Sequence, residues 1–169
     1  MALTIRNAVD ADLDALIRLN AQMQRLHAQV YPADFKSRTD GGEVRDFLAS
    51  VMRRTDHILL IAQVDGAVAG YAWFEIQDRP QTPFTWPRKR VFLHHICVDS
   101  GHRRSGVGSA LITRVEEQAL AAGIGEFALD MWSLNDTAQA FFKSCGLTTY
   151  RLFLRKQTVP GGKVQGRGV

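Results

Sequence analysis

The pattern of apolar and polar residues predicts a strand hairpin in the first half of the chain. Residues 58–64 and 67–76 are two runs rich in β-branched and aromatic residues, and Asp65 and Gly66 stand between them. An Asp-Gly pair tolerates the positive φ angles of a two-residue hairpin turn. We therefore expect two antiparallel strands joined at these two residues.

Two other segments have the spacing of amphipathic helices. Asp10, a residue type that caps helix starts, precedes six apolar residues that recur at helical spacing: Leu13, Leu16, Ile17, Leu19, Met23 and Leu26. Residues 43–54 place a further five on one helical face: Val44, Phe47, Leu48, Val51 and Met52. Each segment is predicted to be a helix that packs against a sheet.

The remaining pattern completes a mixed sheet with helices on its faces. We expect strands at residues 4–8, 91–98, 127–132 and 149–156, and helices from the turn at 106 to about 122 and at 135–145. Residues 78–90 hold three prolines and are predicted to be a loop. The order β-α-α-β-β-β-α-β-α-β is that of an α/β protein of the mixed α+β kind, not of an alternating doubly wound fold.

Composition and charge exclude several classes of protein. A chain of 169 residues predicts one domain, which we place at residues 1–157, while the glycine-rich tail 158–169 is predicted to be disordered. No run approaches the length of a membrane helix, and the net charge of +4 is modest, so no membrane or nucleic-acid partner is expected. Cys97 and Cys145 lie in apolar patterns without metal-ligand spacing. We therefore expect reduced cysteines, no metal and a cytoplasmic location.

The junction that follows residues 91–98 is the first candidate for a functional site. An apolar strand is followed there by Arg103-Arg104-Ser105-Gly106-Val107-Gly108 and then by a helix. The free N–H groups of a helix N-terminus and its positive dipole end attract anions. The lysine of a phosphate-binding Walker loop and the third glycine of a dinucleotide fingerprint are both missing. Two roles for the glycines stay open: backbone approach to phosphates, or close packing of helix and strand.

The spacing Arg-x-x-Gly-x-Gly at this junction resembles the diphosphate signature of the GNAT superfamily of acetyl-CoA-dependent N-acetyltransferases. Residues 129–147 resemble the second signature of the family, and residues 150–156 resemble its closing strand. The resemblance implies a largely antiparallel central sheet that splays open between the strands near 91–98 and 126–132. It also implies acetyl-CoA as cofactor and transfer of its acetyl group to a primary amine of a small molecule or peptide.

The resemblance assigns a set of cofactor-binding residues. In the family, the strand before the turn holds the pantetheine arm, the turn holds the diphosphate, and the second signature contacts the arm. The corresponding positions here are Ile96, Cys97, Val98, Arg103, Arg104, Ser105, Gly106, Val107, Gly108, Ser109, Asn135, Ala138, Phe141 and Phe142. Asn135 is equally explained as a helix cap.

A base that takes the proton of the amine is sought on the strand at 91–98. His94 and His95 are adjacent, so a regular strand would point them to opposite faces, with His94 on the face of Phe92, Ile96 and Val98. Family positions that match 92 and 94 often supply this base, and residue 92 is Phe. His94 is therefore the candidate base, and a hydrogen-bonded core histidine is the competing interpretation.

The general acid and the acceptor pocket are less well defined. The family commonly places a tyrosine where this chain has Phe142, which has no proton to give. Tyr150 and Tyr71 are substitutes that nothing in the spacing supports, and Tyr150 is retained as the candidate acid. Four residues are candidates for the acceptor pocket: Asp130, Trp132, Glu75 and Trp86. Asp130, expected inside a strand, would either face the cleft or form a core salt bridge.

Two functions from different classes remain. The first is direct acetyl transfer in a ternary complex, because neither cysteine has a paired base that would make it a nucleophile. The second is an acyl-CoA-binding sensor or structural module without turnover, to which Phe142 gives weight. The identity of the amine and the formation of a homodimer are left open by the sequence.

Overall fold

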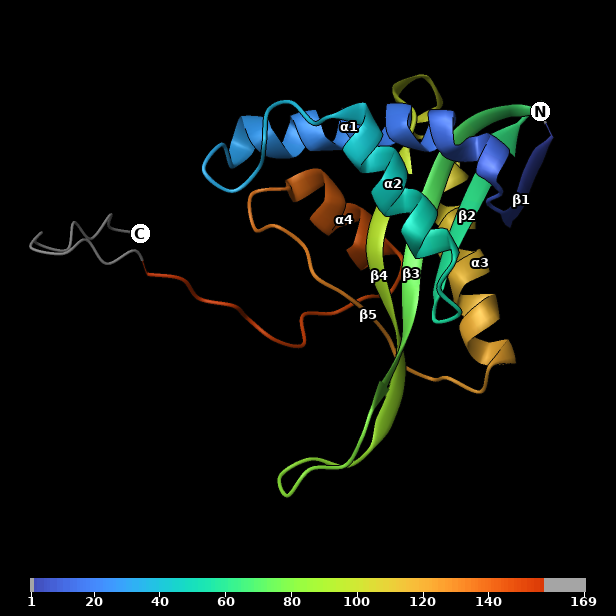
Figure 1. Cartoon of the computed structure of the whole chain (residues 1–169). Helices are drawn as coiled ribbons and strands as arrows, with labels where there is room; N and C mark the ends of the chain where they lie inside the picture. Colours follow the sequence, from blue (N-terminus) through green and yellow to red (C-terminus); the bar gives the residue numbers. More distant parts are fainter. Residues whose placement is uncertain (1, 157–169) are drawn as a thin grey trace, which may run out of the picture.

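The computed structural model describes residues 2–156, which form one five-stranded sheet with helices on both faces (Figure 1). The strands are β1 (Leu3–Asn7), β2 (His57–Val64), β3 (Ala67–Arg79), β4 (Arg88–Val98) and β5 (Phe127–Leu129), in the spatial order 1-2-3-4-5. Neighbours are antiparallel from β1 to β4, and β5 runs parallel to β4. The mixed, largely antiparallel sheet that we predicted is confirmed.

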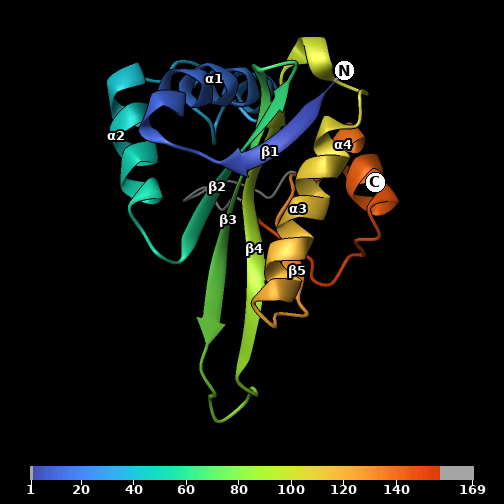
Figure 2. The same cartoon turned by 90° about the vertical axis from the view of Figure 1, so that its right-hand side faces the viewer.

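The sheet divides the hydrophobic core into two layers, and each layer is covered by two helices. On one face, α1 (Leu13–Val30) and α2 (Gly41–Met52) pack against the sheet through residues such as Leu16, Leu48 and Tyr71. On the other, α3 (Val107–Ala121) and α4 (Asp136–Ser144) contribute Leu111 and Phe142 to the larger cluster. Figure 2 shows the two helix pairs on opposite sides of the sheet. No helix in the described range is both long and apolar enough to cross a membrane.

Helix and turn starts follow from individual side chains. Asp65 and Gly66 adopt φ angles of 49° and 85°, which confirms the predicted hairpin turn. The Asp40 carboxylate caps α2, accepting from the N–H groups of Gly42 and Glu43, so the helix begins two residues before its predicted start. Asp10, predicted as the first cap, does not cap α1, and Asp12 stands at the N-cap position of that helix without a side-chain capping hydrogen bond. The Asp12 carboxylate accepts from the Val9 N–H at 2.8 Å and from Arg6, below a short 3₁₀ turn (Asp10–Asp12).

The hairpin of β3 and β4 is longer than predicted. We expected a loop at residues 78–90, but β3 continues to Arg79 and β4 starts at Arg88. Polar pairs across the strands support this extension, including a hydrogen bond of 2.7 Å from Arg90 Nε to Gln77 Oε1. The three prolines are confined to residues 80–87. This loop projects from the body of the molecule (Figure 1).

Two predicted strands are corrected at the other edge. The strand expected at 127–132 ends at Leu129, and β5 pairs with β4 at three positions, from Val91↔Phe127 to Leu93↔Leu129. Beyond Leu93, β4 continues to Val98 while the chain after Leu129 leaves the sheet, so the two segments diverge as the resemblance implied. The closing strand expected at 149–156 is not formed, because these residues lie outside the sheet with exposed side chains. Residues 158–169, predicted to be disordered, lie outside the described range.

Candidate active site

The turn before α3 presents its backbone to solvent. Arg104 and Gly106 adopt φ angles of 61° and 85°, and α3 begins at Val107. Among the described residues, the N–H groups of 104–109 have no hydrogen-bond acceptor, as expected for a first helical turn. The Ser105 hydroxyl donates to the His102 carbonyl at 2.5 Å and braces the turn. These N–H groups are therefore free to bind an anion at the positive end of the helix.

The two glycines of the turn have different roles. A Cβ on Gly106 would meet nothing within 4 Å, so this glycine is required by its positive φ and not by packing. A Cβ on Gly108 would lie 3.2 Å from the Phe141 ring of α4 and 3.7 Å from Val98. Gly108 therefore allows close approach of α4 and β4. The packing explanation therefore holds for Gly108, whereas Gly106 is needed for the conformation of the turn, and backbone approach to phosphates stays a prediction.

The other residues assigned to the cofactor differ in what they expose. Arg103, Arg104 and Ser109 are exposed, whereas Val107 and Phe142 are buried, so Val107 has mainly its backbone to offer a ligand. The Asn135 side chain caps α4 by accepting from the Ala138 N–H at 3.1 Å, which confirms its predicted role as a cap.

Cys97 has the environment of a packing residue. It lies on the α1 side of β4 and donates its S–H to the Leu19 carbonyl at 3.3 Å. Burial raises the pKa of the Cys97 thiol to about 11. The side chain is thus a thiol near neutral pH, unsuited to nucleophilic attack. Its β4 neighbours Ile96 and Val98 are half-buried against the α3-side core.

A bulge in β4 changes the placement of the two histidines. Trp73 pairs with His95 and the next residue, Phe74, pairs with Leu93, so His94 is an extra residue in the strand. Both imidazoles therefore contact Trp73, His94 stacked at 4.4 Å and 22° and His95 edge-on at 4.9 Å. Our expectation of opposite faces is wrong. His94 shares its face with Phe92 and His95, but not with the α3-side pair Ile96 and Val98 named above.

His94 is paired with a carboxylate. Its Nε2 lies 2.8 Å from Glu75 Oε2, and Gln77 donates to the same oxygen at 3.1 Å. Burial acts to raise the pKa of Glu75, but the hydrogen bonds from His94 and Gln77 outweigh it and leave that pKa below its ordinary value. An ionised Glu75 accepts the Nε2 proton of His94. In the neutral imidazole, the Nδ1 lone pair is then left to take a proton.

His95 is a neutral core histidine. Tyr71 donates its hydroxyl to His95 Nδ1 at 3.2 Å, and Asn20 donates to that hydroxyl at 3.4 Å. Burial, with a smaller effect of the nearby His94 and His27, lowers the pKa of His95 to about 4. Tyr71 is fully buried, and burial raises its pKa. It is therefore a core tyrosine that is not exposed to a substrate as a general acid must be.

The half-buried His95 predicts acid-sensitive stability. Its pKa is about 4 in the folded chain and about 6.5 when unfolded, so the unfolded state binds the extra proton between these values. The free energy of unfolding should therefore fall by up to about 3 kcal/mol as the pH drops from about 6.5 to 4. Urea titrations at several pH values should give His95→Gln a flatter pH dependence than the parent chain. Equal slopes would contradict this origin.

The remaining candidates do not converge on His94. Trp132 packs on Tyr31 and Phe35, with ring centroids 4.6 and 4.9 Å apart. Asp130 follows the end of β5 and is exposed, so neither a strand-interior position nor a core salt bridge is correct. Trp86, 83 % exposed in the projecting loop, and Tyr150, equally exposed outside the sheet, are both remote from packed structure.

Sequence reasoning missed His57, which faces the same cluster. One ligand atom from each of His57, Glu75 and His94 lies within 4.8 Å of the others, a separation that would suit a metal. However, Trp73 Nε1–H donates to His57 Nδ1 at 2.9 Å, so a neutral His57 carries its proton on Nε2 and has no free lone pair. We therefore assign the cluster as a hydrogen-bonded network.

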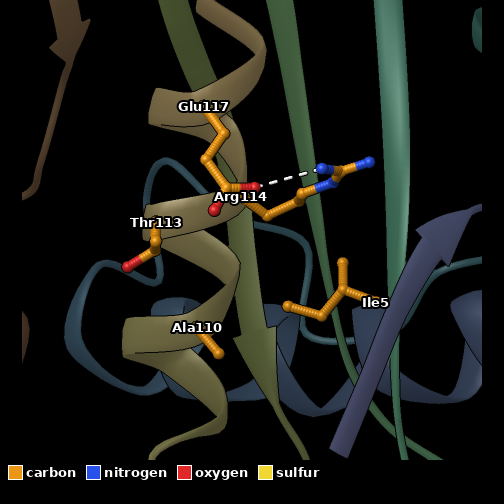
Figure 3. Close-up of a pocket in the computed structure, with 5 residues that line it drawn as sticks. All are labelled: Ile5, Ala110, Thr113, Arg114 and Glu117. Atoms are coloured by element: carbon orange, nitrogen blue, oxygen red, sulfur yellow. Dashed lines mark hydrogen bonds and ion pairs between the residues drawn. The ribbon is translucent and has the colours of Figure 1, made fainter.

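Two surface hollows lie outside this cluster. One, of about 560 Å³, lies between β1 and α3 and is lined by Ile5, Ala110, Thr113, Arg114 and Glu117. Figure 3 shows the ion pair between Arg114 and Glu117, which both belong to α3 and are 3.0 Å apart. None of its lining residues belongs to the turn or to the histidine cluster. The other, of about 290 Å³, borders the turn and brings Arg25 of α1 beside Arg103.

Comparisons with known proteins identify the class that this fold and site define. The model of the Acetyltransferase (GNAT) family matches residues 20–147, and the chain belongs to this family. Its chemistry is amine N-acetylation.

Individual relatives agree with this assignment. The aminoglycoside N(6')-acetyltransferase type 1 of Klebsiella aerogenes is 30 % identical over 106 residues, covering 63 % of this chain and 68 % of that protein. The thialysine N-epsilon-acetyltransferase of Bos taurus is 26 % identical over 153 residues, covering 84 % and 82 %. A mutant of the BH1408 protein from Bacillus halodurans has the same fold, with a TM-score of 0.84 at 22 % identity over 92 % of this chain and 99 % of that one.

Proposed function

We propose that the chain transfers the acetyl group of acetyl-CoA directly to a primary amine of a small molecule, with His94 as the base. One observation carries the proposal: β4 runs from the His94–Glu75 pair to Val98, and Val98 lies beside Gly108 of the turn whose amides are free. A proton-accepting group and an anion-binding turn therefore lie at the two ends of the unpaired part of β4.

The cofactor would lie along the part of β4 that β5 leaves unpaired. Pairing with β5 ends at Leu93, so the strand has a free edge from residue 94 to Val98, roughly 13 Å at 3.3 Å per residue. The amides of a pantetheine arm can hydrogen-bond to such an edge as an added strand does. A backbone N–H of this edge, at Ile96 or Val98, would polarise the thioester carbonyl. Arg103, with Arg25 beside it, would add positive charge near the diphosphate.

Each of these residues is proposed to have one role in the reaction. The cationic amine loses one proton to His94 Nδ1, and Glu75 stabilises the imidazolium that results. The amine nitrogen attacks the thioester carbon, and the nitrogen of the tetrahedral intermediate loses its second proton to water. The C–S bond breaks as this intermediate collapses to the amide. Because Phe142 has no hydroxyl and Tyr150 lies outside the packed sheet, we propose that the CoA thiolate takes its proton from solvent. A thiol pKa near 8.5 makes the thiolate an adequate leaving group.

The acceptor is proposed to be a small primary amine. The names of the two relatives above refer to an amine of an aminoglycoside and to the side-chain amine of thialysine. Glu75, ionised next to His94, would attract a cationic amine before its proton is removed. We place the enzyme in the cytoplasm, in keeping with the free cysteines Cys97 and Cys145.

Thiol release separates this function from that of an acyl-CoA sensor. The protein is incubated with acetyl-CoA and a panel of primary amines, including amino acids, polyamines, aminosugars and a lysine peptide, and free thiol is followed with a chromogenic reagent. We expect thiol release that depends on the amine, with acetylated amine detected by mass spectrometry. Tight acetyl-CoA binding without thiol release on any amine would support the sensor instead.

A further inference from the structure

Trp73 links three histidines of the site. Its indole N–H donates to His57 Nδ1 at 2.9 Å, one face of its ring stacks on His94, and His95 meets it edge-on. The Trp73 side chain is 7 % exposed, and Phe47 of α2 packs edge-on against it at 5.5 Å. The orientation of this one indole therefore affects the position of the His94 ring.

His57 is held as a neutral hydrogen-bond acceptor. Its side chain is 7 % exposed, and Nε2 has no hydrogen-bond partner among the described residues. The carboxylate of Asp56 lies 3.9 Å from His57 Nε2, and Arg54 donates hydrogen bonds to both of its oxygens. Burial lowers the pKa of His57, and a proton on Nδ1 would also face the Trp73 N–H. The ring thus keeps the lone pair that fixes the indole.

His94 depends on such side-chain contacts because it is the extra residue of a bulge. A regular strand would fix its direction through the register of the ladder, whereas a bulge redirects the side chain. Two close contacts constrain the ring: Glu75 at the Nε2 edge, 2.8 Å away, and Trp73 on the face, 4.4 Å between centroids. The rings of Phe92, at 5.1 Å, and His57, at 5.7 Å, lie further out. Loss of either close contact lets Nδ1 move away from the amine.

We propose that His57 is a positioning residue for acetyl transfer: it fixes the Trp73 indole, which in turn holds the His94 ring against Glu75. This inference rests on the proposed role of His94 as the base. On the free edge of β4, the His57 ring stacks on the His94 ring at 5.7 Å and 25°, and His57 forms no hydrogen bond or ion pair with the described residues of the turn before α3. Its effect should therefore fall on kcat and not on acetyl-CoA affinity.

The test compares three single variants and one double variant. His57→Phe keeps a ring but removes the acceptor, His57→Gln restores an acceptor oxygen, and Trp73→Phe removes the donor. His57→Phe should lower kcat about tenfold, because small misplacements of a base are costly, while KM for the amine and Kd for acetyl-CoA stay within about twofold. His57→Gln should recover kcat to within about threefold of the parent enzyme. The double variant His57→Phe/Trp73→Phe should be no slower than Trp73→Phe, because both changes remove one hydrogen bond.

Several results would overturn the proposal. These are an unchanged kcat in His57→Phe, a kcat in His57→Gln as low as in His57→Phe, or losses that add in the double variant. If His57→Phe does not fold, Trp73→Phe must still lose kcat and His57→Gln must still retain it. A His94→Gln enzyme with full activity would refute the base itself. Inactive His94→Gln alongside normal His57→Phe would refute His57 alone.

Discussion

Replacing Gly106 by valine is expected to weaken acetyl-CoA binding by about 30-fold. Gly106 has a φ angle of 85°, which a β-branched residue adopts at a cost of about 2 kcal/mol or avoids by turning the peptide. If the free turn relieves the strain by turning the peptide, binding must restore the strained conformation or lose contacts, since the amides of 104–109 are the groups proposed to hold the diphosphate. A Cβ at this position meets no protein atom within 4 Å, so the loss is not a packing effect. Isothermal titration calorimetry measures it.

The same helix supplies a matched control. Gly123 follows the C-terminal end of α3 with a φ angle of 71°, and a Cβ there also meets nothing within 4 Å. Gly123→Val should therefore lower the melting temperature as Gly106→Val does while leaving the Kd for acetyl-CoA unchanged. Equal affinity losses in both variants would mean that general destabilisation, and not the turn, controls binding.

Replacing His94 by glutamine is expected to lower kcat/KM for the amine by about a hundredfold or more, the range in which a general base contributes. Glutamine can still donate to Glu75 but has no basic nitrogen. Acetyl-CoA binding should stay within about twofold of the parent value, because the turn is untouched. Initial rates of thiol release, measured with saturating acetyl-CoA, give the comparison.

His95→Gln is the control for this variant. His95 contacts the same indole from the same strand, but burial lowers its pKa to about 4 and Tyr71 occupies its Nδ1. It should therefore retain most of the catalytic rate. A fast His94→Gln enzyme together with a slow His95→Gln enzyme would reverse the assignment of the base.

Local sequence signals predicted most of the fold. The turn at Asp65–Gly66, the amphipathic helices and the glycine-bearing junction before α3 each depend on a few adjacent residues. The prediction of a closing strand was wrong because strand pairing depends on residues that are distant in the sequence. Residues 149–156 have the apolar pattern of a strand, but pairing requires a partner edge elsewhere in the chain, which local pattern does not reveal.

The arrangement of the site depends on two bulges that alternation cannot predict. Ala69 is an extra residue of β3, since Ala62 pairs with Gly70 and Gln63 with Val68. An unbroken ladder from Val64↔Ala67 would place His57 opposite Phe74, whereas the bulge places it opposite Glu75. The second bulge, at His94, brings both histidines against Trp73. Each bulge moves the side chains beyond it to the opposite face of the sheet. The contacts among His57, Trp73, His94 and Glu75 therefore cannot be predicted from the sequence and are found only in the structure.

The most direct test of the account is the response of the backbone amides to acetyl-CoA in solution. In ¹H–¹⁵N correlation spectra of the isotopically labelled protein, saturating acetyl-CoA should shift the amide resonances of residues 104–109 more than those of the 560 Å³ hollow between β1 and α3. Unmoved resonances at 104–109 under saturation would contradict the claim that this turn binds the diphosphate, and with it the placement of the whole cofactor along β4.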